Sequence, residues 1–136
     1  MTIFNLETDI EVYCITAKSF PDGVLEAHQA LHALIPYTTD RKYFGISYPE
    51  KPGSIIYKAA ANELISGELS KHDLEKFIVK KGKYNCILIN DFMQNIPAIG
   101  TAFQKLISQP DIDPNGCCVE WYLSDKDVRC MVRLSS

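Results

Sequence analysis

The hydrophobic and polar positions change their spacing several times along the first half of the chain. Residues 10–17 are rich in β-branched and aromatic side chains, which favours a strand. Across residues 24–35 the apolar residues recur at steps of three and four, the spacing of one buried helical face. Pro36 ends this pattern, and the prolines and glycine of residues 49–53 predict a turn. We therefore expect the order β-α-β-β, with a strand at 10–17, a helix at 24–35 and strands at 42–48 and 54–60.

The second half repeats this order after a polar connector at residues 62–72. Asn95 can cap a second helix, and its apolar stripe ends before Pro110. The strands on either side of Gly82 are expected to form a hairpin with a lysine-rich, solvated turn. The residues before position 10 are expected to be irregular. The predicted elements are strands at 74–79, 83–89, 117–123 and 128–134, with the helix between Asn95 and Pro110.

Two copies of one unit account for this order. A shift of 72 residues places the first half on the second and aligns five identical residues in register with the predicted elements. The matched pairs are Cys14 with Cys86, Ile15 with Ile87, Phe20 with Phe92, Ala30 with Ala102 and Leu34 with Leu106. We predict an α+β fold, one domain over residues 1–136, built of duplicated β-α-β-β units (about 8–61 and 73–134) with antiparallel sheets. The units are expected to share a central crevice between the repeats, where ligands commonly bind.

The composition is that of one folded globular domain. Its 136 residues are 46% hydrophobic and 23% charged. With 14 basic and 17 acidic residues the net charge is −3, so no overall positive field attracts nucleic acid and no direct nucleic-acid binding is expected. No apolar run has the length of a membrane span, and residues 1–9 lack the features of a secretory signal. We therefore expect a cytoplasmic protein without a membrane partner.

Neither the cysteines nor the histidines predict a metal site. The five cysteines are an odd number without Cys-x-x-Cys spacing, so reduced thiols are expected. His28 and His32 are four residues apart and share a helix face, which is the spacing of a two-histidine metal site. No acidic or cysteine third ligand lies near them in the sequence, and exposure on the helix surface explains them more simply. We expect no metal and no cofactor.

Glu120 lies within a segment that has the pattern of a strand. Side chains alternate along a strand, so if Val119, Trp121 and Leu123 face the helix-packed core, then Glu120 and Tyr122 face the opposite side. A carboxylate on a wall shared by both halves is partly desolvated. Such a group either binds a cation or acquires a raised pKa. Glu120 is therefore a candidate ligand-binding residue.

The two halves differ at this strand. Matching them places Gly45 and Ser47 opposite Glu120 and Tyr122, so one half leaves space where the other projects polar groups. The alternative to ligand binding is an ion pair between Glu120 and an arginine of the adjacent strand, either Arg129 or Arg133.

Aromatic side chains gather in the elements that would border the crevice. They suit a cationic, planar guest through stacking and cation–π attraction. Core packing is the alternative explanation, above all for Trp121, and Phe20 and Phe92 could instead staple the starts of the two helices. The predicted ligand-binding residues are Glu120, Tyr122, Trp121, Phe20, Phe92, Tyr43, Tyr48 and Tyr57.

Two stretches resemble a known family. The first is Phe-Gly-Ile-Ser-Tyr at residues 44–48, followed by a strand at 55–59. The second is Gly-Lys-Tyr at residues 82–84, followed by a helix and then by Glu-Trp-Tyr-Leu-Ser-Asp at 120–125. Over residues 8–134 the chain is similar to the GyrI-like family, also called the bacterial transcription-activator effector-binding domain, within the SOUL-type helix-grip superfamily.

The resemblance implies a domain that binds small, often cationic or aromatic molecules in a pocket between its repeats. A buried glutamate, here Glu120, would meet the positive charge. Many members follow the Gly-Lys-Tyr strand with a His-x-Gly-Pro-like stretch, whereas this chain has Leu-Ile-Asn-Asp-Phe at 88–92. Regulators of the family usually carry an attached DNA-binding domain. Because this chain begins almost directly at its first predicted strand, we expect a standalone version.

Three functions are compatible with these residues. The first is a standalone small-molecule-binding protein that holds a cationic or aromatic ligand with Glu120 and the aromatic side chains. The second is a hydrolase of small electrophilic compounds, in which Glu120 would position water and Tyr122 would donate a proton. The third is an inhibitor of a protein partner, related to the gyrase inhibitors.

Overall fold

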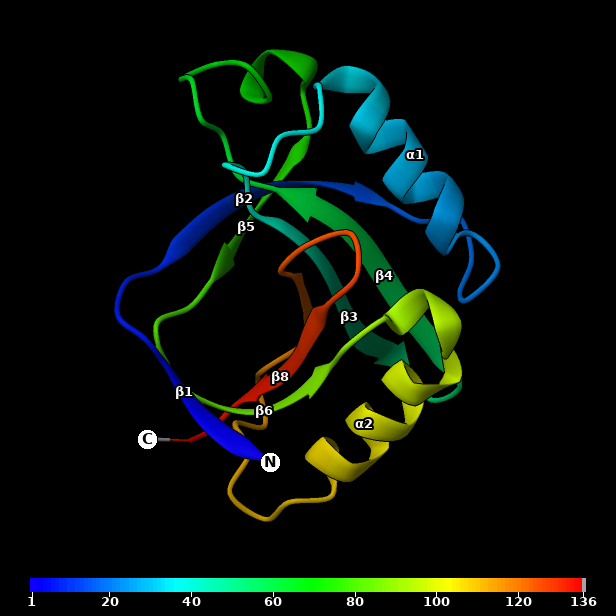
Figure 1. Ribbon diagram of the computed structural model, residues 1–136, viewed down its shortest axis with the longest axis vertical. Helices are drawn as coiled ribbons and strands as arrows, with labels where there is room; N and C mark the ends of the chain where they lie inside the picture. Colours follow the sequence, from blue (N-terminus) through cyan, green and yellow to red (C-terminus); the bar gives the residue numbers. More distant parts are fainter. Residues whose placement is uncertain (136) are drawn as a thin grey trace.

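The computed structural model describes residues 1–135, which form one curled antiparallel sheet with two helices outside the curl (Figure 1). No helix in this part of the chain is both long and apolar enough to cross a bilayer. The first half contains β1 (Thr2–Leu6), β2 (Ile10–Thr16), α1 (Val24–Leu34), β3 (Tyr43–Lys51) and β4 (Ser54–Ala61). The second half contains β5 (Glu75–Val79), β6 (Gly82–Ile89), α2 (Pro97–Ile107), β7 (Cys118–Tyr122) and β8 (Val128–Arg133), with short 3-10 turns η1 (Ser70–His72) before β5 and η2 (Phe92–Gln94) before α2.

The strands follow the order β1-β6-β8-β7-β3-β4-β2-β5 across the sheet. Every neighbouring pair is antiparallel. The strands β3-β4-β2 of one half and β7-β8-β6 of the other have the same order, and the halves meet where β3 pairs with β7. The predicted α+β class and the duplicated β-α-β-β order are therefore confirmed, and the two halves share one continuous sheet.

A leading strand precedes each β-α-β-β unit and pairs with the other unit. β1 pairs with β6, and β5 pairs with β2. The hairpin expected about Gly82 is therefore wrong, because β5 and β6 do not pair and lie toward opposite ends of the sheet order. Gly82 has a φ of +135°, a conformation open to glycine, at the point where the chain turns away from β5. The irregular start expected before residue 10 is also wrong, since residues 2–6 form β1.

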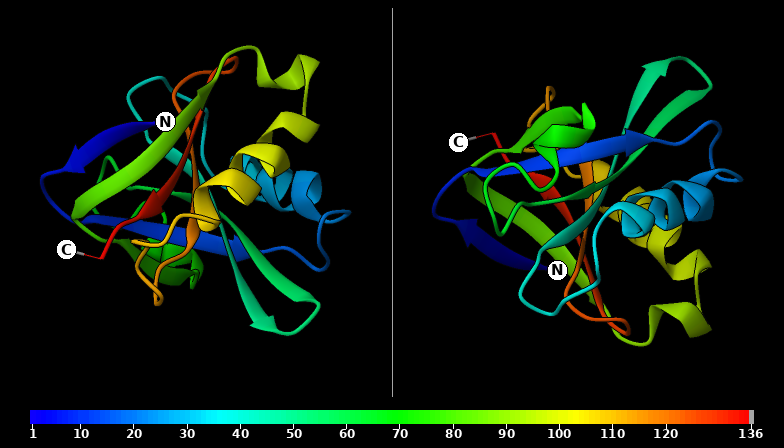
Figure 2. Two further views of the ribbon diagram at one scale, coloured as in Figure 1. Left: turned by 90° about the horizontal axis from the view of Figure 1, so that it is seen from below. Right: turned by 90° about the horizontal axis from the view of Figure 1, so that it is seen from above.

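The sheet buries both of its faces. One face of all eight strands closes around an inner core, which includes Phe44, Ile46 and Met131. On the other face, α1 packs on β2 and β4 while α2 packs on β6 and β8. Both helices lie on the same side of the curl in each view (Figure 2). The helix residues that are buried against the sheet are Ala27 and Leu31 of α1 and Ala102 and Leu106 of α2.

Two isoleucines of the β3–β4 pair provide a test of the inner core. Ile46 is 0% exposed and Ile55 is 43% exposed. Ile46→Ala removes packed side-chain volume from the core, so we expect it to lower the free energy of unfolding by about 2–5 kcal/mol. The same change at Ile55 should cost less than about 1 kcal/mol because solvent already reaches that side chain. Urea unfolding of both variants measures the difference, and equal losses would contradict the placement of the core.

Candidate functional site

Glu120 occupies the middle of β7, near the line where the two halves of the sheet meet. It lies opposite Gly45 of β3 and Cys130 of β8 and is 9% exposed. Glu120 and Tyr122 point toward the helices, whereas Val119 belongs to the inner core. The alternation along this strand is therefore as predicted, but the two sides are reversed. Alternation alone does not distinguish them, because both faces of the sheet are buried.

A hydrogen-bonded network surrounds the Glu120 carboxyl group. The hydroxyl of Tyr57, from β4, donates to Glu120 Oε1 over 3.0 Å. The hydroxyl of Tyr122 donates to the same oxygen, and the two tyrosine oxygens are 3.3 Å apart. His28 of α1 places its Nε2 atom 2.8 Å from the Tyr57 oxygen. Elements from both halves thus converge on one carboxyl group.

Aromatic rings enclose this network. Phe20, in the loop before α1, stacks on Tyr57 with ring centroids 5.9 Å apart and planes 22° apart. Phe92 of η2 lies against Tyr122 at 5.5 Å. Phe20 is 45% exposed, whereas Phe92 and Tyr57 are buried. Phe20 is therefore the wall of the cluster that solvent reaches most readily.

Gly45 makes the network sterically possible. A Cβ atom at this position would lie 2.0 Å from the Tyr57 oxygen and 2.6 Å from Glu120 Oε1. The missing side chain therefore leaves the space in which Tyr57 crosses β3 to reach Glu120. The predicted opposition of Gly45 and Glu120 is confirmed, but Ser47 pairs with Cys118 rather than with Tyr122 because the strands are antiparallel.

Burial sets the charge state of each group in the network. It raises the pKa of the Glu120 carboxyl, although the hydrogen bonds from Tyr122 and Tyr57 oppose this shift. Burial and the nearby Glu120 charge raise the pKa of Tyr57 and of Tyr122, so both stay protonated. Burial, with a smaller contribution from His32, lowers the pKa of His28 to about 4. At neutral pH, Tyr57, Tyr122 and His28 are therefore uncharged, and Glu120 is the acid of this network whose ionisation burial opposes and the two tyrosine hydrogen bonds favour.

No basic residue neutralises Glu120 within residues 1–135, since none of the ion pairs there includes it. The guanidinium of Arg129 lies over the rings of Phe4 and Trp121, at 4.2 and 5.2 Å from their centroids. Arg133 pairs with Asp113 over 3.1 Å. The alternative ion pair of Glu120 with either arginine is thus not formed.

The structure brings together five of the predicted residues and separates three. Glu120, Tyr122, Tyr57, Phe20 and Phe92 form the cluster described above. The other three do not join it. Trp121 points to the opposite face against Phe4 and Phe44, Tyr43 lies against His32 and Tyr37, and Tyr48 lies beneath the ammonium group of Lys58.

His28 is the site residue that the sequence pattern did not reveal. It is expected on the helix surface, but its ring packs against Tyr57 and Tyr122 with centroids 5.7 and 5.4 Å away. Its position beside Ala27 in the apolar stripe of the helix was the available signal. Within residues 1–135 no three histidine, cysteine or acidic side chains gather in a group that could hold a metal ion.

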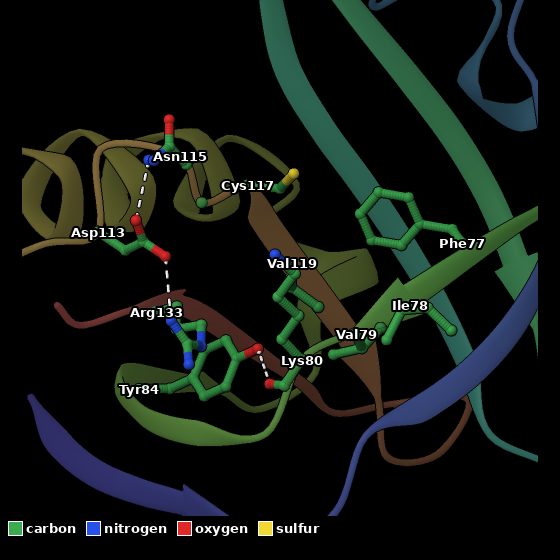
Figure 3. A pocket seen from close by; sticks show the side chains of 11 residues that line it. Phe77, Ile78, Val79, Lys80, Tyr84, Asp113, Asn115, Cys117, Val119 and Arg133 are labelled. Atoms are coloured by element: carbon green, nitrogen blue, oxygen red, sulfur yellow. Dashed lines mark hydrogen bonds and ion pairs between the residues drawn. The ribbon is translucent and has the colours of Figure 1, made fainter. Parts of the chain in front are cut away.

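A separate hollow lies away from Glu120, near the loop that precedes β7 (Figure 3). It encloses about 50 Å³ and adjoins a wider depression of about 310 Å³ that shares Phe77 and Cys117 with it. Its polar groups bond one another: Arg133 donates to Asp113, and Tyr84 donates to the Lys80 carbonyl oxygen (Figure 3). Around Glu120 the aromatic rings of the cluster pack on one another instead. Phe20 is the most exposed of these rings.

Comparison with known proteins gives the fold. No protein-family model matches the chain, and no curated protein matches it. An integron cassette protein from the mobile metagenome of Vibrio cholerae superposes with a TM-score of 0.73 at 16% identity, covering 98% of this chain and 95% of that one. A hydrolase from Listeria innocua superposes with a TM-score of 0.60 at 13% identity, covering 98% of this chain and 90% of that one. Both share the overall fold of this chain.

Gly45→Ala tests the steric basis of the network. The new methyl group collides with Tyr57, so we expect a loss of about 1–3 kcal/mol in the free energy of unfolding. Gly100→Ala is the matched control, because nothing lies within 4 Å of a Cβ at that helical position. The control should gain up to about 1 kcal/mol from helix propensity. Thermal unfolding compares the two, and a neutral Gly45→Ala would contradict the close approach of Tyr57.

The lowered pKa of His28 predicts a pH-dependent stability. The unfolded chain binds a proton on this residue below about pH 6.5, but the folded chain resists it down to about pH 4. Stability from this group is therefore present above pH 6.5 and is lost as the pH falls toward 4. Relative to His28→Gln, the wild type should lose up to about 3 kcal/mol across this range. Unfolding at several pH values measures this loss. The control is His72→Gln, since His72 is exposed. A difference in free energy of unfolding between wild type and His28→Gln that does not change with pH would contradict the burial of His28.

Proposed function

We propose that this protein binds a small cationic aromatic molecule between α1 and α2, with the Glu120 carboxylate as its counter-charge. The observation that carries the proposal is a buried carboxyl group that, within residues 1–135, has no basic partner and has one oxygen without a hydrogen bond. The charge of this group, the aromatic walls around it and the family likeness support the proposal.

The second carboxylate oxygen of Glu120 is open. Within residues 1–135 the hydrogen bonds to Glu120 all end on Oε1. The side-chain polar atom that is fully buried there without a partner is Arg41 Nε, so Oε2 is not sealed from solvent. A buried carboxylate is stable when it is paired, and a ligand cation supplies the missing partner.

The aromatic walls suit the organic part of such a ligand. Phe20 stacks on Tyr57, and a planar guest can take its place on the same ring after a movement of the loop before α1. Each good cation–π contact with the tyrosines contributes on the order of 1–2 kcal/mol. The charge and the stacking surfaces therefore select the same class of molecule.

The family likeness points the same way. The motifs at residues 44–48, 82–84 and 120–125 resemble the GyrI-like effector-binding domain, and the duplicated fold is compatible with it. We assign the chain to this family as part of the proposal.

A second candidate is a hydrolase of small electrophilic compounds. The observation that favours it is the chain of hydrogen bonds from His28 through Tyr57 to Glu120 and Tyr122. The raised pKa of Glu120 suits a general base that positions water, and Tyr122 can donate a proton to an opening ring. The neighbour from Listeria innocua carries the name hydrolase.

Binding of matched ions tests the proposed function. The probes are protonated N,N-dimethyl-1-naphthylmethylamine and the anion 1-naphthylacetate, which share a ring and differ in charge. We expect the protein to bind the amine and not the anion. Glu120→Gln should lower the affinity for the amine at least about tenfold because the counter-charge is lost. Glu50→Gln, an exposed residue of the β3–β4 hairpin, is the control and should bind normally. Titration calorimetry provides the affinities. In a thermal-shift measurement, the amine at a hundred times its dissociation constant should stabilise the folded protein by about 2.7 kcal/mol.

Unchanged amine affinity in Glu120→Gln would contradict the counter-charge role. If that variant keeps affinity for a strained electrophile but loses its turnover, the hydrolase is favoured. If the protein neither binds the cation or the anion nor turns over the electrophile, the small-molecule function is contradicted and an inhibitor of a protein partner is favoured.

A further inference from the structure

The hydroxyl of Tyr57 is the centre of the hydrogen-bond network. Its oxygen lies 3.0 Å from Glu120 Oε1, 2.8 Å from His28 Nε2 and 3.3 Å from the Tyr122 oxygen. A phenol carries one proton and a carboxylate carries none, so Tyr57 is the donor where it meets Oε1. The same rule makes Tyr122 the donor in its own hydrogen bond to Oε1. Both tyrosine protons are therefore directed at Glu120.

His28 occupies the remaining position on the Tyr57 oxygen. Because the Tyr57 proton points at Glu120, the 2.8 Å hydrogen bond requires a hydrogen on His28 Nε2. In the reverse arrangement Tyr57 donates to His28. The Tyr57 oxygen and the carboxylate oxygen Glu120 Oε1 would then face each other over 3.0 Å with no hydrogen between them. The ring meets Tyr57 and Tyr122 edge-on, at interplanar angles of 67° and 87°, which holds its orientation. His28 is therefore the Nε2–H tautomer.

The protons of the network thus all point toward Glu120. Among the carboxyl and hydroxyl groups of the network, within residues 1–135, this leaves one open acceptor, Glu120 Oε2, and no open donor, and His28 Nε2 adds none. We propose that this polarity restricts the ligand to cations that carry an N–H, such as protonated amines and amidinium groups, and excludes quaternary ammonium compounds of the same shape. The inference rests on the proposed cation-binding function and adds the chemical class of the ligand.

The discrimination follows from the open oxygen. An N–H cation donates to Oε2 and supplies the hydrogen bond that this oxygen needs once the ligand covers it. A quaternary cation covers Oε2 and leaves it without a hydrogen bond. An uncompensated buried acceptor weakens binding by at least about tenfold.

The hydrogen-bond directions can be tested without ligand. Two-bond ¹H–¹⁵N correlation NMR at neutral pH identifies the tautomer of each histidine, and His28→Phe assigns the signals of His28 by their loss. We expect the Nε2–H form at His28. The Nδ1–H form would place the Tyr57 proton on His28 and would overturn the proposal, while leaving the counter-charge role of Glu120 intact.

The ligand class is tested with two compounds that differ by one methyl group. They are protonated N,N-dimethyl-1-naphthylmethylamine and its N-methylated quaternary salt, which share the ring and the charge. We expect the wild type to bind the protonated amine at least about tenfold more tightly. In Glu120→Gln the amide places a donor where Oε2 was, so the preference should fall below about threefold. Gln still accepts both tyrosine hydroxyls through its own oxygen, so the network and the fold are retained.

Each other outcome has a distinct meaning. Equal, Glu120-dependent binding of both compounds would overturn the N–H requirement and leave the proposed function standing. A preference that survives in Glu120→Gln would also overturn it, because the discrimination would not come from Oε2. Absence of binding by either compound would contradict the N–H requirement and the proposed function together.

Discussion

A carboxyl group buried in the middle of a sheet, with no basic partner in the part of the chain that the structure describes, is the constraint on which the site depends. Glu120 is held by hydroxyls from β4 and from its own strand, and Tyr57 reaches it only because Gly45 has no side chain. An ionised carboxylate in such a place opposes folding, since part of its hydration is lost. The protein therefore gives up stability at this point, as functional sites commonly do. No ion pair within residues 1–135 relieves that cost.

Much of the fold was predictable because its hydrophobic periods are clear. The helices and seven of the eight strands in residues 1–135 follow from the spacing of apolar residues and from Pro36 and Pro110, which end the helical patterns. Strand pairing was less accessible, since alternation shows which residues share a face but not which strand lies alongside. The internal repeat carried the missing information about β1: the shift of 72 residues that aligns the halves places the predicted strand 74–79 on residues 2–7.

The chemistry of the site was predictable only in part. Glu120 and Tyr122 came from alternation within one strand, and Gly45 from the comparison of the halves. Trp121 could not be separated from them by composition, because its direction depends on which face of a doubly buried sheet the helices cover. His28 required a tertiary fact, namely that α1 packs beside Tyr57. When a residue takes part in a site through a partner on another element, the sequence pattern of its own helix or strand does not reveal that contact.

The crossed pairing of the leading strands has a consequence for how this architecture could arise. Each half lends its first strand to the edge of the other, β1 to β6 and β5 to β2. Two identical chains of half this length, exchanging their N-terminal strands about a twofold axis, would close the same sheet. Such a homodimer would have to present the same residue from both subunits at its axis. Tandem fusion removes that symmetry requirement, and it permits a glycine on one side of the β3–β7 junction to face a glutamate on the other.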